Sequence, residues 1–262
     1  MAEKPKSFEE FYYKIKDDIW DIDIVSDYAE THDGTIGEFS GNMFCPECKK
    51  AELTFVHKTS KRRAYLRRNQ SSQHEVGCSY NYDYASRRTV KQYVDSLSYE
   101  EIQDKLSSFM RLLCNNKKRH VDKLDINSVL KDVPNPMLIP EKSHTNNVLK
   151  ALRRKRLNSW IDESDGEDFC VFYGKVKLQV TEKEKKGKVP EDSYKYNLLQ
   201  VYTKNKKGEW KFRTSLYRGN IKDIVNENSI YNIVLIGHLD FKFKPFTIKL
   251  ANKNALKIQE IL

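Results

Sequence analysis

Three cysteines and one histidine are the residues of this chain whose types and spacing most clearly indicate chemistry. Cys45 and Cys48 form a Cys-x-x-Cys pair, and His74 and Cys78 form a His-x-x-x-Cys pair further along. Thiolate sulfur and imidazole nitrogen are ligands that Zn²⁺ prefers, and four of them complete a tetrahedral site of the structural kind. The two pairs therefore predict a bound Zn²⁺, with His57 as an alternative to His74 as the histidine ligand.

A hairpin between the two pairs is needed to bring these ligands together. Phe44 and Pro46 flank Cys45, which suits a tight knuckle at the end of a strand. The apolar residues of 53–57 predict a strand that carries the chain away from the knuckle, before it returns to the second pair. This order of elements predicts a zinc ribbon, a fold in which the metal supplies much of the folding free energy.

Two further elements are predicted before the ribbon. Residues 7–20 carry apolar side chains at helical spacing, and Ser7 with Glu10 matches a capping box, so we expect an amphipathic helix. Asp33 and Gly34 are typical of a hairpin turn, so we expect two short strands to lead into the knuckle.

Basic residues dominate the segment that follows the predicted strand. Arginine can bind phosphate oxygens through two hydrogen bonds, and a neighbouring tyrosine can stack on a base. Because no acidic residue interrupts the segment, it predicts a nucleic-acid-binding hairpin tip, with a solvated ribbon surface as the alternative. The residues that we expect to contact nucleic acid here are Lys61, Arg62, Arg63, Tyr65, Arg67 and Arg68.

The composition of the whole chain agrees with a polyanionic partner. The sequence has 47 Lys and Arg against 37 Asp and Glu, a formal net charge of +10, which favours nucleic acid. No apolar run reaches the ~18 residues that a membrane helix needs, and the N-terminal residues contain no apolar core of a signal peptide. With five cysteines and no export signal, we expect a cytoplasmic protein with reduced cysteines and no membrane partner.

A helical pair is predicted over residues 86–116. Ser98 and Glu101 match a capping box, and apolar residues follow at spacings of three and four. We expect the two helices to pack on the ribbon, which gives a zinc-ribbon domain with flanking helices over 1–116.

An irregular connector is predicted over residues 117–168. It contains three prolines, which interrupt regular structure, and a strongly basic run that we interpret as a short helix or turn. Arg153 and Arg154 of this run are further candidate contacts for nucleic acid.

From residue 169 onward the pattern changes to strands. Three strand-like segments, a short helix over 219–228 and two further strands follow one another. This order predicts an α+β protein whose C-terminal domain, 169–262, is an OB-like five-stranded β-barrel. Gly174 lies inside the first strand and predicts a bulge or a sharp bend there.

The third strand of this barrel divides its side chains between two faces because alternate residues point in opposite directions. The predicted core side carries Trp210, Phe212, Thr214 and Leu216. OB barrels bind single strands on the face of their second and third strands. On the other side of the third strand, we therefore expect Lys211, Arg213 and Tyr217 to contact nucleic acid.

The region from 27 to 80 resembles the zinc-binding N-terminal region of competence-protein CoiA-like proteins. The features that carry the resemblance are the Cys-Pro-Glu-Cys knuckle, the basic and aromatic hairpin, and the His/Cys pair. The resemblance implies Cys45, Cys48, His74 and Cys78 as zinc ligands and an association with DNA processing; similar ribbons suit mobile-element and phage-defence proteins. Members of that group continue into a nuclease-like domain. This chain departs there, because after Cys78 we find no convincing Asp…Glu-x-Lys set on adjacent predicted strands, so nuclease activity is not carried over.

These features favour a non-catalytic, zinc-containing protein that binds nucleic acid, DNA rather than RNA, without strong sequence preference and with single strands as the form bound. A protein-interaction adaptor that docks a larger effector enzyme is one alternative. The other is an unrecognised metal-dependent nuclease that uses the carboxylates of Asp17, Asp21 and Asp23, or of Asp165, Glu167 and Asp168. No P-loop, G-x-G-x-x-G, G-x-S-x-G or H-E-x-x-H motif is present, which argues against the enzyme.

Overall fold

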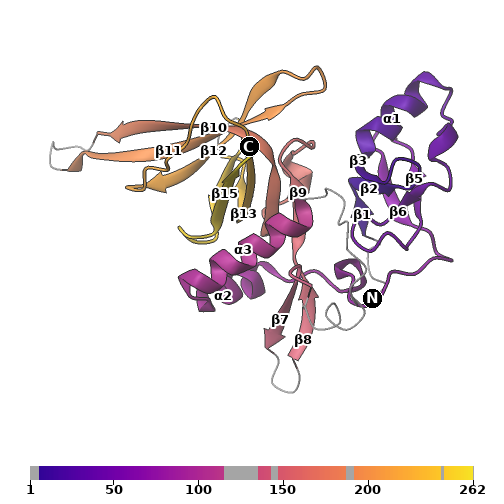
Figure 1. The fold of residues 1–262 in the computed structure, drawn as a ribbon, viewed down its shortest axis with the longest axis horizontal. Helices are drawn as coiled ribbons and strands as arrows, with labels where there is room; N and C mark the ends of the chain where they lie inside the picture. The colour runs from indigo at the N-terminus through magenta and orange to yellow at the C-terminus, as the bar shows by residue number, and fades with distance from the viewer. Residues whose placement is uncertain (1–5, 115–134, 143–146, 187–191, 243–244, 262) are drawn as a thin grey trace. The chain divides into compact units, whose positions relative to one another are not determined.

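The computed structural model describes residues 6–114, 135–142, 147–186, 192–242 and 245–261 (Figure 1). These residues divide into two compact units, the first made of 6–83 with Asn135, and the second of 84–114 with the described residues from 136 onward. The described part of the chain forms an α+β fold with three α-helices and a closed five-stranded β-barrel. None of its helices is long and apolar enough to cross a membrane.

Short strands around an aromatic core build the first unit. Two three-stranded sheets have the orders β1-β6-β5 and β3-β2-β4. The rings of Phe11, Tyr13 and Phe39 are buried between these elements, with centroids 5.1 to 6.2 Å apart. The elements are β1 (Ser7–Phe8), β2 (Glu10–Tyr13), β3 (Asp18–Asp21), α1 (Ile22–Thr31), β4 (Met43–Phe44), β5 (Leu53–Val56) and β6 (Tyr65–Arg68), with short 3-10 turns at Gly37–Phe39 and Ser79–Asn81.

The helix expected over 7–20 was a wrong prediction, because these residues form β1, β2 and β3. Phe11 and Tyr13 are both fully buried, which is the two-residue period of a strand. A turn between β2 and β3 places Asp17 at a φ of 48°, a conformation that Asp tolerates better than most residues.

The hairpin expected at Asp33 and Gly34 was also a wrong prediction. These residues end helix α1, since the N–H of Gly34 donates to the carbonyl of Ala29 at 2.8 Å. Gly34 has a φ of 81°, the left-handed conformation that commonly ends a helix. Asp33 and Gly34 do form a turn, as predicted, but this turn ends a helix and does not join two strands.

The second unit contains the barrel, which closes in the order β10-β11-β12-β14-β13-β10. Only the β12–β14 pair in this ring is parallel, and the other pairs are antiparallel. The strand number and closure agree with the predicted OB-like barrel. Its strands are β10 (Cys170–Lys185), β11 (Tyr194–Lys204), β12 (Trp210–Gly219), β13 (Tyr231–Asp240) and β14 (Thr247–Leu250).

Strand β10 closes the barrel by changing partner along its length. It pairs with β13 over residues 170–176 and with β11 over 177–185. Gly174 lies close to this change with a φ of 152°, a value that L side chains rarely adopt. The register of β10 with β13 continues without a shift through Gly174, so the predicted bulge does not form there, and the sharp bend stays a prediction.

The helical pair is confirmed, but it packs on the barrel instead of the ribbon. Helices α2 (Arg87–Ser96) and α3 (Tyr99–Leu113) belong to the second unit, and α3 contacts β13, β10 and β15 (Leu256–Glu260). Figure 1 shows both helices beside these strands. Strand β13 is buried along nearly its whole length, because Val234 and Ile236 face the helices while Ile233 and Leu235 face the barrel interior.

Much of the expected connector is regular structure. Strands β7 (Leu138–Lys142) and β8 (Asn147–Ala151) form a hairpin, and β9 (Arg153–Arg156) runs parallel to β10 as the last strand of the barrel sheet. The short basic helix or turn expected here was therefore a wrong prediction. The part of the expected connector over 117–134 lies outside the described residues.

The helix expected over 219–228 does not form either. Arg218 and Asp223 make a two-point ion pair at 2.8 and 3.1 Å, and both side chains are largely buried. The N–H of Asn226 donates to the hydroxyl of Tyr231 at 2.6 Å. These contacts hold the segment between β12 and β13 in an irregular conformation. The fifth predicted strand is in fact two, β14 and β15.

Candidate metal centre and nucleic-acid interface

The four predicted metal ligands lie together in the first unit. Their ligand atoms are all within 4.8 Å of one another, and this cluster could hold a metal ion. The sulfur atoms of Cys45 and Cys78 are 3.8 Å apart, and Nδ1 of His74 is 3.5 Å from the sulfur atoms of both Cys48 and Cys78. His57, the alternative ligand, is not part of the cluster.

Backbone hydrogen bonds shape the loop that carries the first pair of ligands. Cys45 follows strand β4, and its N–H donates to the carbonyl of Ala51 at 2.7 Å. The N–H of Lys49 donates back to the carbonyl of Cys45 at 2.9 Å, and Lys49 has a φ of 55°. This tight reversal brings Cys45 and Cys48 into one cluster.

Aromatic rings hold the histidine ligand. The ring of His74 lies 6.0 Å from that of Phe8 and 5.8 Å from that of Tyr80, at small interplanar angles. Phe8 belongs to β1, which pairs with β6, so the N-terminal strand supports a ligand far away in the sequence. Sequence reasoning missed both rings because it assigned Phe8 to a helix.

Glu47 connects the two halves of the cluster. Its carboxylate accepts hydrogen bonds from the N–H and the hydroxyl of Ser79, both at 2.6 Å, and Ser79 directly follows the last ligand. The side-chain amide of Asn135 also donates to Glu47 at 2.6 Å and to the carbonyl of Gly77 at 2.8 Å. Sequence reasoning missed Glu47, for which the only signal was its place inside the Cys-x-x-Cys loop.

The thiols of the cluster differ in their ionisation. Burial raises the pKa of Cys45 to about 12, so this thiol keeps its proton unless a cation replaces it. Hydrogen bonds from Cys45 and Cys78 lower the pKa of Cys48, which makes Cys48 the thiolate of the group. A cluster with one thiolate and two further thiols that a cation can deprotonate is suited to binding a metal ion.

The predicted basic hairpin is present as β5 and β6 with their connection. The side chains of Lys61, Arg62 and Arg63 are exposed in the connection. The guanidinium of Arg62 lies 3.7 Å from the ring centroid of Tyr65, so it covers one face of the ring that was expected to stack on a base. Arg67 and Arg68 are exposed on β6, and Arg68 donates to backbone carbonyls of the following turn.

Arg153 and Arg154 lie in the second unit, on strand β9. Nε of Arg153 is 3.4 Å from the carboxylate of Asp168, and its guanidinium lies 4.3 Å from the ring centroid of Tyr84. Both arginines are partly buried. Both arginines therefore belong to an edge strand of the barrel sheet and not to the separate basic helix or turn that was expected.

A β-bulge changes which side chains of β12 face outward. Val201 pairs with Thr214 but Tyr202 pairs with Phe212, so Arg213 is an extra residue in this strand. Beyond the bulge the alternation is lost, because Lys211 and Phe212 are both exposed, Phe212 at 41%. The core position predicted for Phe212 was wrong, whereas Thr214 and Leu216 are buried as predicted.

The three predicted contacts on β12 have different surroundings. Arg213 turns inward, where its Nε donates to the carbonyl of Leu157 at 2.7 Å and its Nη2 donates to that of Ser159. Lys211 is exposed and pairs with Glu209 at 3.4 Å. Tyr217 is 57% exposed and is the predicted contact that lies on an open face of the barrel.

This open face is a groove of about 510 Å³ on the outer side of β11 and β12. The rings of Tyr194, Tyr196 and Tyr217 follow one another along it, 6.1 and 5.4 Å apart. Of the residues that line the groove, Tyr217 was predicted to contact nucleic acid, and Phe212 was predicted to lie in the core. The groove is lined by Lys185, Tyr194, Tyr196, Leu198, Phe212, Ser215, Tyr217, Pro245, Phe246, Thr247, Ile248 and Lys249.

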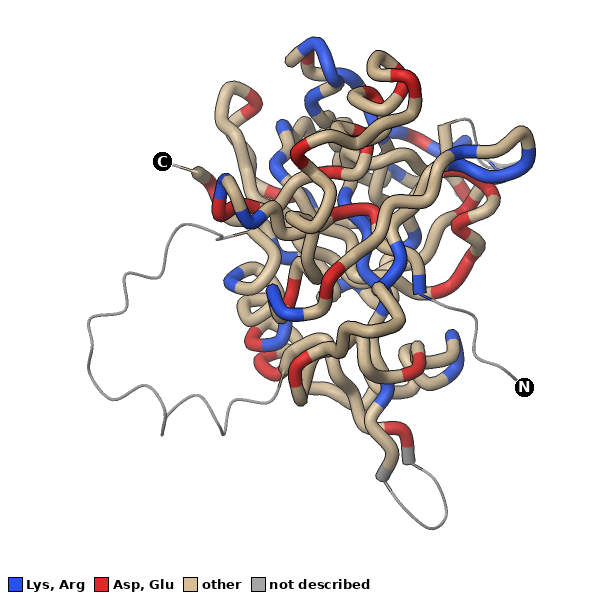
Figure 2. Tube along the Cα trace, turned by 90° about the vertical axis from the view of Figure 1, so that its right-hand side faces the viewer, with Lys and Arg blue, Asp and Glu red and all other residues tan. Residues whose placement is uncertain are grey.

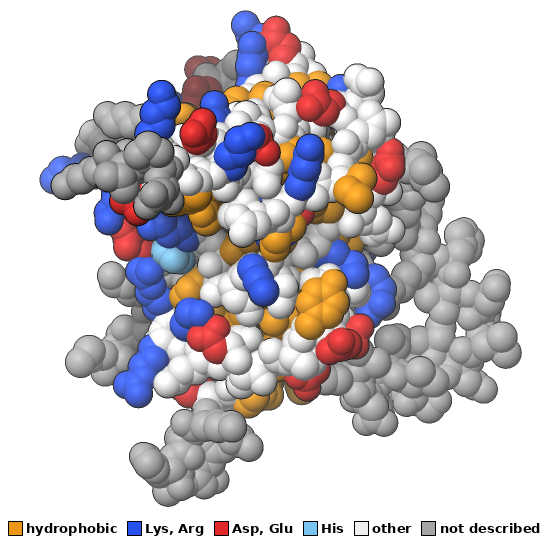
Figure 3. Space-filling view, turned by 90° about the vertical axis from the view of Figure 1, so that its left-hand side faces the viewer, with side chains coloured by type: hydrophobic (Ala, Val, Ile, Leu, Met, Phe, Trp, Pro, Cys, Tyr) orange, Lys and Arg blue, Asp and Glu red, His pale blue; other side chains and the backbone are white. Residues whose placement is uncertain are grey.

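Lysines accompany the aromatic side chains on this face. Across the antiparallel β10–β11 pair, Lys185 is opposite Tyr194 and Lys183 is opposite Tyr196. Figure 3 shows hydrophobic side chains and those of Lys and Arg interspersed on one face of the molecule. Figure 2 shows basic and acidic residues interspersed along the trace, so the excess positive charge is not confined to one segment.

Comparisons of the chain with protein-family models, with curated proteins and with solved structures find no match.

Proposed function

We propose that this protein binds single-stranded nucleic acid, DNA rather than RNA, on the outer face of its OB-like barrel and without catalysis. The observation that carries the proposal is the row of Tyr194, Tyr196 and Tyr217 in a groove that also contains Lys185 and Lys249. Aromatic rings stack on bases of any sequence, and lysines neutralise the phosphates between them. This combination fits sequence-tolerant binding of an unpaired strand.

We further propose that the metal of the first unit is Zn²⁺ and that this unit is a zinc ribbon. Three cysteines and one histidine are a donor set that zinc prefers in structural sites. A regular tetrahedron with zinc–sulfur bonds of ~2.3 Å separates its sulfur atoms by ~3.8 Å, and the sulfur atoms of Cys45 and Cys78 are 3.8 Å apart. The exposed basic residues of β6 and of the connection between β5 and β6 would add a second, non-specific phosphate contact.

A fluorescence-anisotropy titration tests the nucleic-acid proposal. Labelled single-stranded DNA, duplex DNA and RNA are titrated with the full chain at ~50 and ~200 mM salt. We expect single-stranded DNA to bind most tightly and its affinity to fall steeply with salt. Absence of binding to any of the three at low salt would contradict the proposal and favour the adaptor instead.

Variants in the groove separate stacking from charge. Tyr217→Ala should weaken single-strand binding about 5- to 150-fold, because stacking contributes ~1–3 kcal/mol per base, and should leave the salt dependence unchanged. Lys185→Gln should reduce the slope of log K against log salt by ~0.7 for one lost phosphate contact. Tyr99→Ala is the matched control, since Tyr99 is also 57% exposed but lies on helix α3.

A further inference from the structure

Trp160 is an exposed aromatic side chain that the fold holds in place. It is 63% exposed, although an indole gains much from burial. Its Nε1 donates to Oδ2 of Asp162 at 3.0 Å, and Oδ1 of Asp162 accepts from the N–H and hydroxyl of Ser164 at 2.9 and 2.5 Å. The ring is therefore oriented in its exposed position, which lowers the entropy cost of binding a planar ligand.

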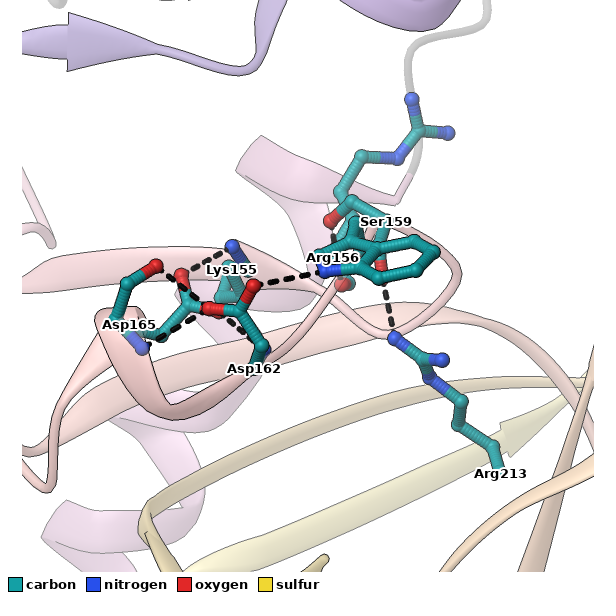
Figure 4. A network of polar contacts seen from close by, with 8 residues as sticks. Lys155, Arg156, Ser159, Asp162, Asp165 and Arg213 are labelled. Atoms are coloured by element: carbon teal, nitrogen blue, oxygen red, sulfur yellow. Dashed lines mark hydrogen bonds and ion pairs between the residues drawn. The ribbon is translucent and has the colours of Figure 1, made fainter. Parts of the chain in front are cut away.

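The acidic loop that follows Trp160 is largely neutralised from within. Lys155 is almost fully buried and its Nζ lies 2.5 Å from Oδ1 of Asp165, beside Asp162 (Figure 4). Two further carboxylates of the loop have cationic partners, with Arg153 3.4 Å from Asp168 and Arg87 3.3 Å from Glu167. Of the two other carboxylates, that of Asp162 accepts hydrogen bonds from Trp160 and Ser164, and Glu163 is exposed. The loop therefore presents less negative charge to a polyanion than its sequence indicates.

A cationic side chain links this loop to the groove. The guanidinium of Arg213 binds the carbonyls of Leu157 and Ser159, and Figure 4 shows it approaching Ser159. The same guanidinium lies 5.2 Å from the ring centroid of Phe246, which lines the groove. Arg213 therefore contacts both Phe246, which lines the groove, and Ser159, the residue before Trp160.

We propose that Trp160 is a second base-stacking site, on which the indole binds a nucleobase of the same strand that occupies the groove. The inference rests on the proposed function, and it extends the binding path from Tyr217 past Phe246 and Arg213 to Trp160. Stacking on an indole accepts every base, so this site adds affinity and length to the path without adding sequence preference.

The test compares strand lengths. Oligothymidylates of ~4, ~8, ~12 and ~16 nucleotides, a range that OB barrels cover, are titrated against the full chain by anisotropy. Short strands that fill only the groove should bind wild type and Trp160→Ala equally. Strands long enough to reach the indole should bind Trp160→Ala about 5- to 150-fold more weakly, Trp160→Phe should recover part of the loss, and Tyr99→Ala should change nothing.

Tryptophan emission gives a second readout that does not depend on the alanine variant. Long strands should quench emission of the wild type more than that of Trp160→Phe, and short strands should quench both equally. If Trp160→Ala and Trp160→Phe bind every length as the wild type does while Tyr217→Ala is impaired, the second site is overturned and the proposed function stands. If the wild type binds no strand of any length, both are overturned.

Discussion

At the scale of single residues, Lys105 shows how the fold changes the chemistry of a side chain. Its Nζ donates to the carbonyl of Leu138 at 3.2 Å and lies 5.5 and 5.8 Å from the ring centroids of Tyr93 and Phe109. Burial among these groups lowers the pKa of Lys105 to about 8. An unfolded lysine has a pKa of about 10.4, so the unfolded chain binds the proton more tightly than the folded chain.

We therefore expect a stability gain at alkaline pH that depends on Lys105. Between pH ~8 and ~10.4 the unfolded state binds more protons, so the free energy of unfolding rises with pH across this window, and the full penalty applies below pH ~8. Lys105→Met should remove this dependence and stabilise the second unit at pH 7 by about 1–2 kcal/mol. Urea unfolding at several pH values measures it, with the exposed Lys253→Met as control. Identical pH profiles for both variants would contradict the prediction.

Residue types and spacing were sufficient to predict the Cys/His cluster but not the residues that support it. Cys45, Cys48, His74 and Cys78 are recognisable because two short-range pairs carry the donor atoms, and their cluster is confirmed. The residues around them act through tertiary contacts, as Glu47 does across the cluster, and no local pattern encodes such contacts. In the barrel, alternation predicted the exposed position of Tyr217 correctly but failed at Arg213 and Phe212, since one extra residue interrupts the alternation.

At the scale of elements, long segments were predicted well and short ones poorly. The helices α2 and α3 have two to four turns, and their apolar spacing, with the Ser98 and Glu101 capping box, is unambiguous. Strands of two to four residues, such as β1 and β2, are too short to show a period, and Phe8 and Phe11 match a helix equally well. The barrel strands are long enough for the sequence to predict their order along the chain. Which strands pair depends on tertiary contacts, such as the close approach of β14 to Gly237.

Gly237 is required where β13 and β14 meet. A Cβ at this position would lie 2.6 Å from the carbonyl oxygen of Lys249 and 2.9 Å from a methyl group of Ile248. Gly237→Ala should therefore push β14 away from β13 and lower the free energy of unfolding of the barrel by about 1–3 kcal/mol. Gly208→Ala is the comparison, because the space around it is open and only its φ of 80° is strained. Chemical denaturation of both variants measures the difference, and equal, small losses would show that β14 adjusts freely.

At the scale of the whole molecule, the two units have separate cores. The core of the first unit contains Phe8, Phe11 and Tyr13 together with the ligands Cys45 and Cys78. The second unit has one core inside the barrel and another between the barrel and the helices. The metal cluster contributes to the first of these cores alone, so the loss of a metal ion should affect the units unequally.

Metal removal should therefore unfold one unit and spare the other. The first unit has short strands and a small core, so binding of the metal contributes much of its folding free energy. We expect the zinc content to be one per chain, and a chelator or Cys78→Ser should abolish the thermal transition of the first unit while that of the barrel remains. Calorimetry with elemental analysis measures both.

Cys114→Ser is the control, because Cys114 lies at the end of α3 in the second unit, outside the cluster. A single transition that shifts as a whole after chelation would mean that the two units fold as one, and retention of the metal by Cys78→Ser would remove Cys78 from the ligand set.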